Sequence, residues 1–198
     1  MSIPSRVIGT FLFMTRARFD EINNLIDGFT EELAKGEKTI QEAEDDFFDY
    51  LVYLYLTGFG DVNEYLALET QINDEKMLQT IYKVIGGENC FNRLVKAVGN
   101  ENRVSNEDIK RIIDTEFHRI YNSGTYDSAV ASGVPLKKRW ATMEDLKVRD
   151  THFYLEGVEK DLTDYFYTFD GDKALYPTDF ETAQNNVNCR CWIEIVKQ

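Results

Sequence analysis

Hydrophobic positions recur every three or four residues through the first two thirds of the chain, which is the spacing of one face of an α-helix. This pattern predicts a first helix at about residues 5–34, either continuous or broken at Gly28. The sequence from Thr39 to Glu42 matches a capping box, and the apolar and aromatic run after it predicts a second helix that ends at Gly58. Because this second helix is apolar on nearly every side, we expect it to lie in a core or an interface.

Further helices follow from the same periodicity and from the glycines that divide it into segments. They are predicted at residues 61–68, 74–85, 89–98 and 106–124. The last of these begins with a capping sequence at Ser105 and is expected to end at Gly124, because glycine commonly follows the last turn of a helix. The N-terminal region is therefore predicted to be helical throughout.

The hydrophobic period changes from about 3.6 to 2 after Pro135. Alternation predicts strands at residues 137–142 and 188–196. Between them, Thr142 is predicted to cap a helix at residues 143–157. Further along, an Asp-Gly pair at residues 170 and 171 stands between apolar runs, which is a β-hairpin signal.

Together these elements predict an α+β fold. A helical region at residues 1–104 is followed by a small α+β module at residues 105–198, whose sheet is short and mainly antiparallel. No internal repeat or low-complexity linker interrupts the chain.

The net negative charge of the chain limits the classes of macromolecule that it can bind. The 198 residues carry 35 acidic and 22 basic side chains, a formal net charge of −13. Residues 1–70 alone hold 14 acidic and 5 basic side chains, so this part of the chain should repel nucleic acid. Lys137, Lys138 and Arg139 form one small basic island. We therefore expect no bulk nucleic-acid binding and favour a basic protein surface as the partner of the acidic region.

The N-terminal apolar run predicts neither a signal peptide nor a membrane anchor. It is too short to span a bilayer, is interrupted by Arg16 and Arg18, and lacks the small residues of a signal cleavage site. The three cysteines are an odd number, which argues against a disulfide framework. We expect a protein of a reducing compartment that does not associate with membranes.

Two of the cysteines stand close together on the last predicted strand. Alternation places Cys189 and Cys191 with Ile193 and Ile195 on one apolar face, against which the segment bearing His152 is expected to pack. Four interpretations remain open: buried thiols of the core, a zinc site of both cysteines and His152 that needs a fourth ligand, a strained disulfide, or a nucleophilic cysteine.

Other candidate chemistry is sparse. On the predicted helix 143–157, Asp145, Arg149 and His152 stand at positions i, i+4 and i+7 and form one polar stripe, in which Asp145 can pair with Arg149. His118 lies among apolar residues and is interpreted as a structural side chain. The sequence has no glycine-rich phosphate loop, no HExxH and no GxSxG motif, so no single motif indicates catalysis.

The order of several residues in the second half of the chain resembles the C-terminal module of the phage Mu F-like minor head, or head-morphogenesis, proteins. The resemblance covers about residues 105–196. It is carried by Thr115, Glu116, Trp140, Asp145, Arg149, His152, Asn188, Cys189, Arg190 and Cys191. The family commonly has an arginine before the Thr-Glu pair, whereas this chain has Asp114 there.

The resemblance implies a low-copy virion component that acts in head morphogenesis with the portal protein or the major capsid protein. Such a protein is found in the host cytoplasm during assembly and then in the phage head. A hypothesis from a different class is a nuclease-like or transferase-like enzyme. There His152 would be the acid/base, Glu116 or Asp145 would orient it, and Arg149 or Arg190 would stabilise an anion. This second hypothesis predicts that these side chains meet in an open cleft. Apart from zinc, neither hypothesis implies a cofactor.

Overall fold

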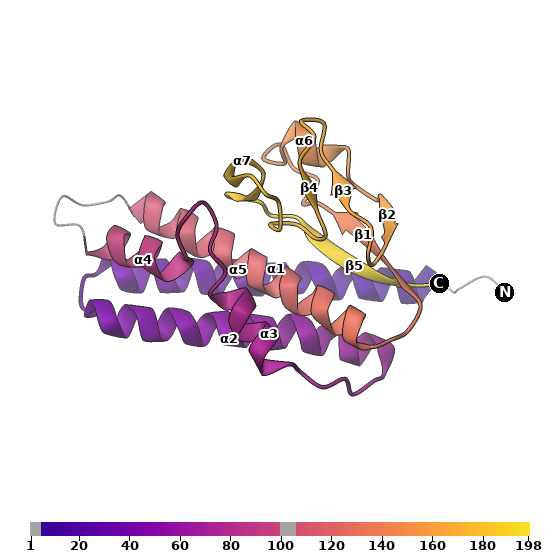
Figure 1. The fold of residues 1–198 in the computed structure, drawn as a ribbon, viewed down its shortest axis with the longest axis horizontal. Coiled ribbons are helices and arrows are strands. Elements are labelled where there is room, and N and C mark those ends of the chain that lie inside the picture. Colours follow the sequence, from indigo (N-terminus) through magenta and orange to yellow (C-terminus); the bar gives the residue numbers. More distant parts are fainter. Residues whose placement is uncertain (1–4, 100–105) are drawn as a thin grey trace.

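The computed structural model of the protein describes residues 5–99 and 106–198, and the side chains of the first helix from residue 17 onward. Its N-terminal half is helical, as the periodicity predicts. Figure 1 shows the long helices α1, α2 and α5 running side by side, with the sheet of the C-terminal module against one side of this helical layer. The helices of this half are α1 (Ser5–Ala34), α2 (Ile40–Leu66), α3 (Asp74–Ile81), α4 (Cys90–Val98) and α5 (Asn106–Ala131).

Capping explains where several of these helices begin. Thr39 accepts a hydrogen bond from the Glu42 N–H at 3.2 Å and donates its own N–H to the Glu42 carboxylate at 2.8 Å, so the predicted capping box is confirmed. Asn73 and Asn89 cap α3 and α4 in the same way with their side-chain oxygens. The predicted cap at Ser105 lies outside the described residues.

Two predicted helix ends are wrong, because α2 continues through Gly58 and α5 continues through Gly124. The expected separate helix at residues 61–68 is therefore the last part of α2, and α1 likewise runs unbroken through Gly28. Gly58 and Gly124 lie where the backbones of α2 and α5 are in close contact, so these glycines permit a helix contact and do not end a helix.

The helical core contains the apolar side of α2. Phe47, Leu51 and Leu54 are fully buried there and pack with residues of α1, α4 and α5, so they belong to the core and offer no contact surface to a partner. Phe29, Phe47 and Phe117 form stacked ring pairs at 6.0–6.3 Å between centroids. Among the described residues, no helix is both long and apolar enough to cross a membrane.

The C-terminal module contains two small antiparallel sheets, which confirms the predicted α+β fold class. The central strand β1 pairs with β2 on one side and with β5 on the other, and Trp140 faces Ile193 across the latter pair. The predicted hairpin is present as β3 and β4. The bounds are β1 (Leu136–Ala141), α6 (Asp150–Phe153), β2 (Glu159–Asp161), β3 (Phe166–Tyr167), β4 (Lys173–Ala174), α7 (Ala183–Asn186) and β5 (Trp192–Lys197).

The predicted helix at residues 143–157 is wrong, since only the four residues of α6 are helical. Local side-chain bonds to the backbone explain the difference. The Thr142 hydroxyl accepts the Glu144 N–H at 3.2 Å, and the Asp145 carboxylate accepts the Lys147 N–H at 2.9 Å. Such bonds compete with helix formation, and Glu144 adopts the left-handed region at φ 52°.

A second core joins the module to the helices. It contains Trp140, Phe166 and both cysteines of the module, together with Tyr126 of α5 and Val62 of α2. The helices α2 and α5 therefore contribute to both cores. The division between residues 104 and 105 falls within residues 100–105, outside the described part, and stays a prediction.

Candidate functional site

His152, Cys189 and Cys191 converge in the core of the module. The imidazole Nδ1 lies 3.5 Å from the Cys189 Sγ and 3.6 Å from the Cys191 Sγ, and all three side chains are buried. The structure therefore brings these three predicted residues together. It does so through α6, which carries His152, and through the segment just before β5, which carries both thiols.

Aromatic side chains surround the imidazole. The Phe180 ring is stacked on His152 at 5.2 Å between centroids, and Trp140 meets it edge-on at 5.6 Å. Within the described part of the chain, the His152 Nε2 has no hydrogen-bond partner. The Nδ1 edge of the imidazole is thus directed at the thiols, within an apolar surrounding.

The two thiols differ in acidity. Burial acts to raise the pKa of Cys189, but hydrogen bonds from Cys191 and His152 outweigh it and hold this pKa well below its ordinary value. The hydrogen bond to Cys189, together with burial, raises the pKa of Cys191 well above its ordinary value. The pair therefore favours one thiolate and one thiol. The third cysteine differs, because burial raises the pKa of Cys90 to about 12.

Asn122 of α5 fixes the start of β5, and the sequence did not indicate this role. Its Nδ2 donates to the Cys191 carbonyl at 3.1 Å, and its Oδ1 accepts the Ile193 N–H at 3.2 Å. The Asn122 side chain is fully buried. Because asparagine is mostly an exposed residue type, its position on a helix carries no signal of such a contact.

The predicted polar stripe of Asp145, Arg149 and His152 does not form, because these residues do not share a helix. Asp145 pairs instead with Arg190, whose Nη2 lies 2.6 and 2.9 Å from the two carboxylate oxygens. The Arg190 guanidinium lowers the pKa of Asp145 by this hydrogen bond. Arg149 donates to the Val187 carbonyl, which ties the loop before α6 to the segment before β5.

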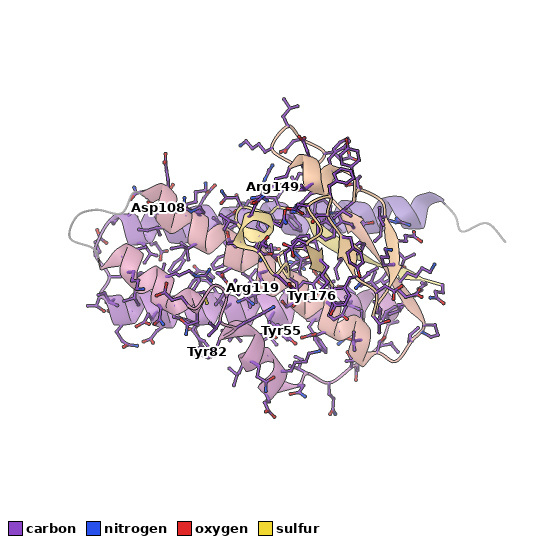
Figure 2. All side chains as sticks on the ribbon, turned by 45° about the horizontal axis from the view of Figure 1, so that its top comes forward. Tyr55, Tyr82, Asp108, Arg119, Arg149 and Tyr176 are labelled. Atoms are coloured by element: carbon purple, nitrogen blue, oxygen red, sulfur yellow. The ribbon has the colours of Figure 1, made fainter. Side chains whose placement is uncertain are left out.

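The Thr-Glu pair on α5 has a structural setting. The Glu116 carboxylate is buried and accepts hydrogen bonds from Arg93 at 2.6 Å and from the Arg119 Nε at 2.7 Å. Figure 2 shows Arg119 within the helical part, toward Tyr176, well apart from Arg149. Thr115 accepts the backbone N–H of Asn188 at 3.1 Å, which holds Asn188 in the left-handed region at φ 55°.

A polar cleft of about 750 Å³ separates α1 and the first turns of α5 from the module. Arg149, Asn188 and Arg190 line it, together with Asp114 of α5. Glu116 lines a different cleft of about 460 Å³, next to Arg93 and Lys96. His152 lines neither of these two clefts. The candidate acid/base, its orienting acids and the arginines are therefore divided among three places.

The remaining candidate features have structural partners. His118 is fully buried and stacks on Phe19 at 4.8 Å between ring centroids. The basic island at residues 137–139 does not form a basic surface. Lys138 is buried and donates to the Leu162 carbonyl at 2.7 Å, while Arg139 pairs with Glu159 at 2.6 Å. The alternation of strand β1 buries Lys138, the middle residue of this island, and the number of basic residues in the sequence did not indicate this.

A profile of the family described as "Phage Mu protein F like protein" matches residues 67–194, about two thirds of the chain. The chain belongs to this phage Mu F-like family. The match includes α5, the strands β1 and β2, the first half of β5 and the cluster of His152, Cys189 and Cys191. It also begins within the helical region, so the family segment is longer than the resemblance at residues 105–196 suggested.

The comparison with curated proteins gives a relative of this phage Mu F-like protein. It is the NAD(+)–arginine ADP-ribosyltransferase EFV of Enterococcus faecalis, 34% identical over 110 residues. These residues are 54% of this chain but 22% of that protein, so the chain spans about a fifth of the relative's length. No solved structure matches the chain significantly.

Proposed function

We propose that the protein is a minor head, or minor capsid, protein that acts in phage head morphogenesis by binding the portal protein or the major capsid protein. The observation that carries this proposal is the family match over residues 67–194. The protein would then be present in the host cytoplasm during assembly and in the virion afterwards. Of the two partners we favour the portal protein, and we treat the capsid protein as an outcome of the test.

An exposed group of aromatic side chains supports a binding role. Phe153 and Tyr154 at the end of α6 and Tyr167 and Phe169 of the hairpin form this aromatic patch, with 59–71% of each residue exposed. The Tyr154 and Phe169 rings contact each other at 4.3 Å between centroids. Clustered exposed aromatic residues are typical of protein–protein contacts. Figure 1 shows α6 and the hairpin on the side of the module that faces away from the helical layer.

The arrangement of the polar candidates also favours binding over turnover. His152 contacts two thiols in a buried site, whereas the Asp145–Arg190 pair and the Glu116 ion pairs lie elsewhere. A general acid/base has to reach its substrate within hydrogen-bond distance. The carboxylates of Asp145 and Glu116 are occupied with intramolecular partners, as expected of a protein that acts by presenting a surface.

The test is co-expression of the full chain with the portal protein of the same phage, followed by affinity capture and sizing of the complex. We expect a stable complex with the unchanged chain. A double variant, Tyr154→Ser with Phe169→Ser, should weaken it by about 10-fold or more, since buried aromatic side chains dominate contact energies. The matched control is Leu56→Ser with Val84→Ser, which removes two exposed apolar side chains of the helical half.

Three results distinguish the alternatives. Failure to associate with the portal protein, but association with the capsid protein, would assign the partner as capsid. If the chain associates with neither the portal protein nor the capsid protein, whether each is supplied separately or both are supplied together, the assembly role is overturned. Equal binding by the aromatic double variant and the control would retain the assembly role but exclude the aromatic patch as its contact.

A transferase-like activity is the second candidate, favoured by the 34% identity to a protein named as an NAD(+)–arginine ADP-ribosyltransferase. The aligned part is only 22% of that protein, which leaves most of it without a counterpart in this chain. Release of nicotinamide from NAD(+) by the purified chain, with an arginine-containing acceptor, would test this activity. Turnover that is lost in His152→Gln and kept in His118→Gln would replace the assembly role with an enzymatic one.

A further inference from the structure

We propose that His152, Cys189 and Cys191 bind one zinc ion, which links the loop of α6 to the segment that enters β5. In the described part of the chain, these residues are the one group of three or more His, Cys, Asp or Glu side chains whose ligand atoms converge in this way. All their ligand atoms lie within 4.8 Å of one another. The proposed site is independent of the binding role proposed above.

The distances fit the corners of a zinc tetrahedron. With Zn–S of about 2.3 Å, Zn–N of about 2.1 Å and tetrahedral angles, a coordinated nitrogen and sulfur stand about 3.6 Å apart. The observed separations from the His152 Nδ1 are 3.5 Å to Cys189 and 3.6 Å to Cys191. An ion can therefore take its place between these atoms with little movement of the three side chains.

The chemistry of the ligand set also fits zinc. Thiolate and imidazole are ligands that Zn²⁺ prefers in proteins, and a two-cysteine, one-histidine set is a known zinc combination. Both sulfurs bind the ion as thiolates, and any proton that they still carry is released to solvent, while the imidazole coordinates through Nδ1 and carries its proton on Nε2. Two thiolates then balance the charge of the ion. A neutral site of this kind suits its buried, aromatic surroundings better than an isolated charge would.

The backbone around the site is held in place by contacts that do not involve the metal. Asn122 binds the backbone on both sides of residue 192, and Arg149 binds the Val187 carbonyl. These contacts fix the two segments that carry the ligands before any ion arrives. No fourth His, Cys, Asp or Glu of the described residues joins the group, so the fourth position belongs to a water molecule or a small anion.

The chain offers matched controls for every ligand, because it has three cysteines and two histidines in all. Cys90 and His118 are buried like the ligands but lie in the helical core. The experiment measures zinc in the purified full chain by elemental analysis after incubation with zinc under reducing conditions and dialysis. We expect about one zinc ion per chain in the unchanged protein, in Cys90→Ala and in His118→Gln. We expect its loss in Cys189→Ala, Cys191→Ala and His152→Gln.

Cobalt substitution provides a readout that needs no variant, in case a ligand substitution prevents folding. Co²⁺ bound to the unchanged chain should give a thiolate-to-cobalt charge-transfer band and the strong visible bands of a tetrahedral site. Less than about a tenth of an equivalent of zinc in the unchanged protein, or a cobalt spectrum without the thiolate band, would overturn the proposal and leave the thiols as core residues. Retention of zinc in all three ligand variants would overturn it as well.

Discussion

Gly58 of α2 and Gly124 of α5 each face the backbone of the other's helix. A Cβ added to Gly58 would lie 2.3 Å from the Tyr121 carbonyl oxygen, and one added to Gly124 would lie 2.2 Å from the Tyr55 carbonyl oxygen. Neither contact is possible for real atoms, and both opposing atoms belong to backbone that cannot rotate away. The close approach of the two long helices therefore requires glycine on both.

Replacement of Gly124 by alanine should destabilise the protein by about 1–3 kcal/mol, because overpacking forces the helices apart. The intrinsic preference of a helix for alanine would offset part of this loss. The control is Gly60→Ala, two residues from Gly58 on the same helix, where an added Cβ meets no atom within 4 Å. This variant should gain up to about 1 kcal/mol. Urea unfolding measures both, and equal effects of the two substitutions would contradict a close helix approach.

Removal of the Asn122 side chain should loosen the attachment of β5 to α5. Asn122→Ala leaves the Cys191 carbonyl and the Ile193 N–H without their partner in a buried place, at an expected loss of about 2–3 kcal/mol. Hydrogen exchange should show faster exchange of the Ile193 amide in particular. Asn24→Ala, at an exposed position of α1, is the control and should change stability by less than about 0.5 kcal/mol.

Lys138 should make stability depend on pH in the alkaline range. Burial lowers the pKa of Lys138 from its ordinary 10.5 to about 8. Between these values the unfolded chain holds the proton more strongly than the folded protein, so the free energy of unfolding should rise as pH increases from about 8 to about 10.5. The contribution of Lys138 to the free energy of unfolding reaches its maximum above pH 10.5, the pKa of the unfolded chain. It is lost as the pH falls through about 8, the pKa of Lys138 in the folded protein.

The comparison of the unchanged chain with Lys138→Met isolates this contribution. The difference in their free energies of unfolding should shift in favour of the unchanged chain across that pH interval, as measured by urea unfolding at several pH values. Lys137→Met removes a positive charge from the neighbouring position of β1 and serves as the control. If the difference in free energy of unfolding between the unchanged chain and Lys138→Met does not depend on pH, burial does not lower the pKa of Lys138.

Glu116 and Asp145, the two acids on which the resemblance to the family depends, should differ sharply in their contribution to stability. Glu116 is 1% exposed and balances Arg119, which is 2% exposed, so Glu116→Gln leaves a buried charge unpaired and should cost about 3–5 kcal/mol. Asp145 is 42% exposed in its pair with Arg190, and Asp145→Asn should cost at most about 1 kcal/mol. Thermal unfolding measures the loss of stability in both variants. A larger loss for Asp145→Asn than for Glu116→Gln would contradict the expectation that the buried ion pair contributes more than the exposed one.

Much of the fold was predictable because its signals are local. The helix periodicity of the N-terminal half, the Thr39–Glu42 capping box and the hairpin at Asp170-Gly171 each depend on residues a few positions apart. The approach of His152 to the cysteines was also predictable, but the strand predicted at residues 188–196 starts too early. β5 begins at Trp192, and Cys189 and Cys191 lie in the segment just before it, buried in the same core as Ile193.

The sequence by itself thus determined the α+β class, most of the helical segments of the N-terminal half and the burial of both cysteines of the module. Only the tertiary structure decided that Gly58 and Gly124 join helices, that Asp145 pairs with Arg190, and that Asn122 holds β5. The physical reason is that the same residue can make one interaction with its neighbours in sequence and a different one with residues that are distant in sequence. Glycine ends an isolated helix but also permits two helices to touch, and only the packed chain shows which of these applies.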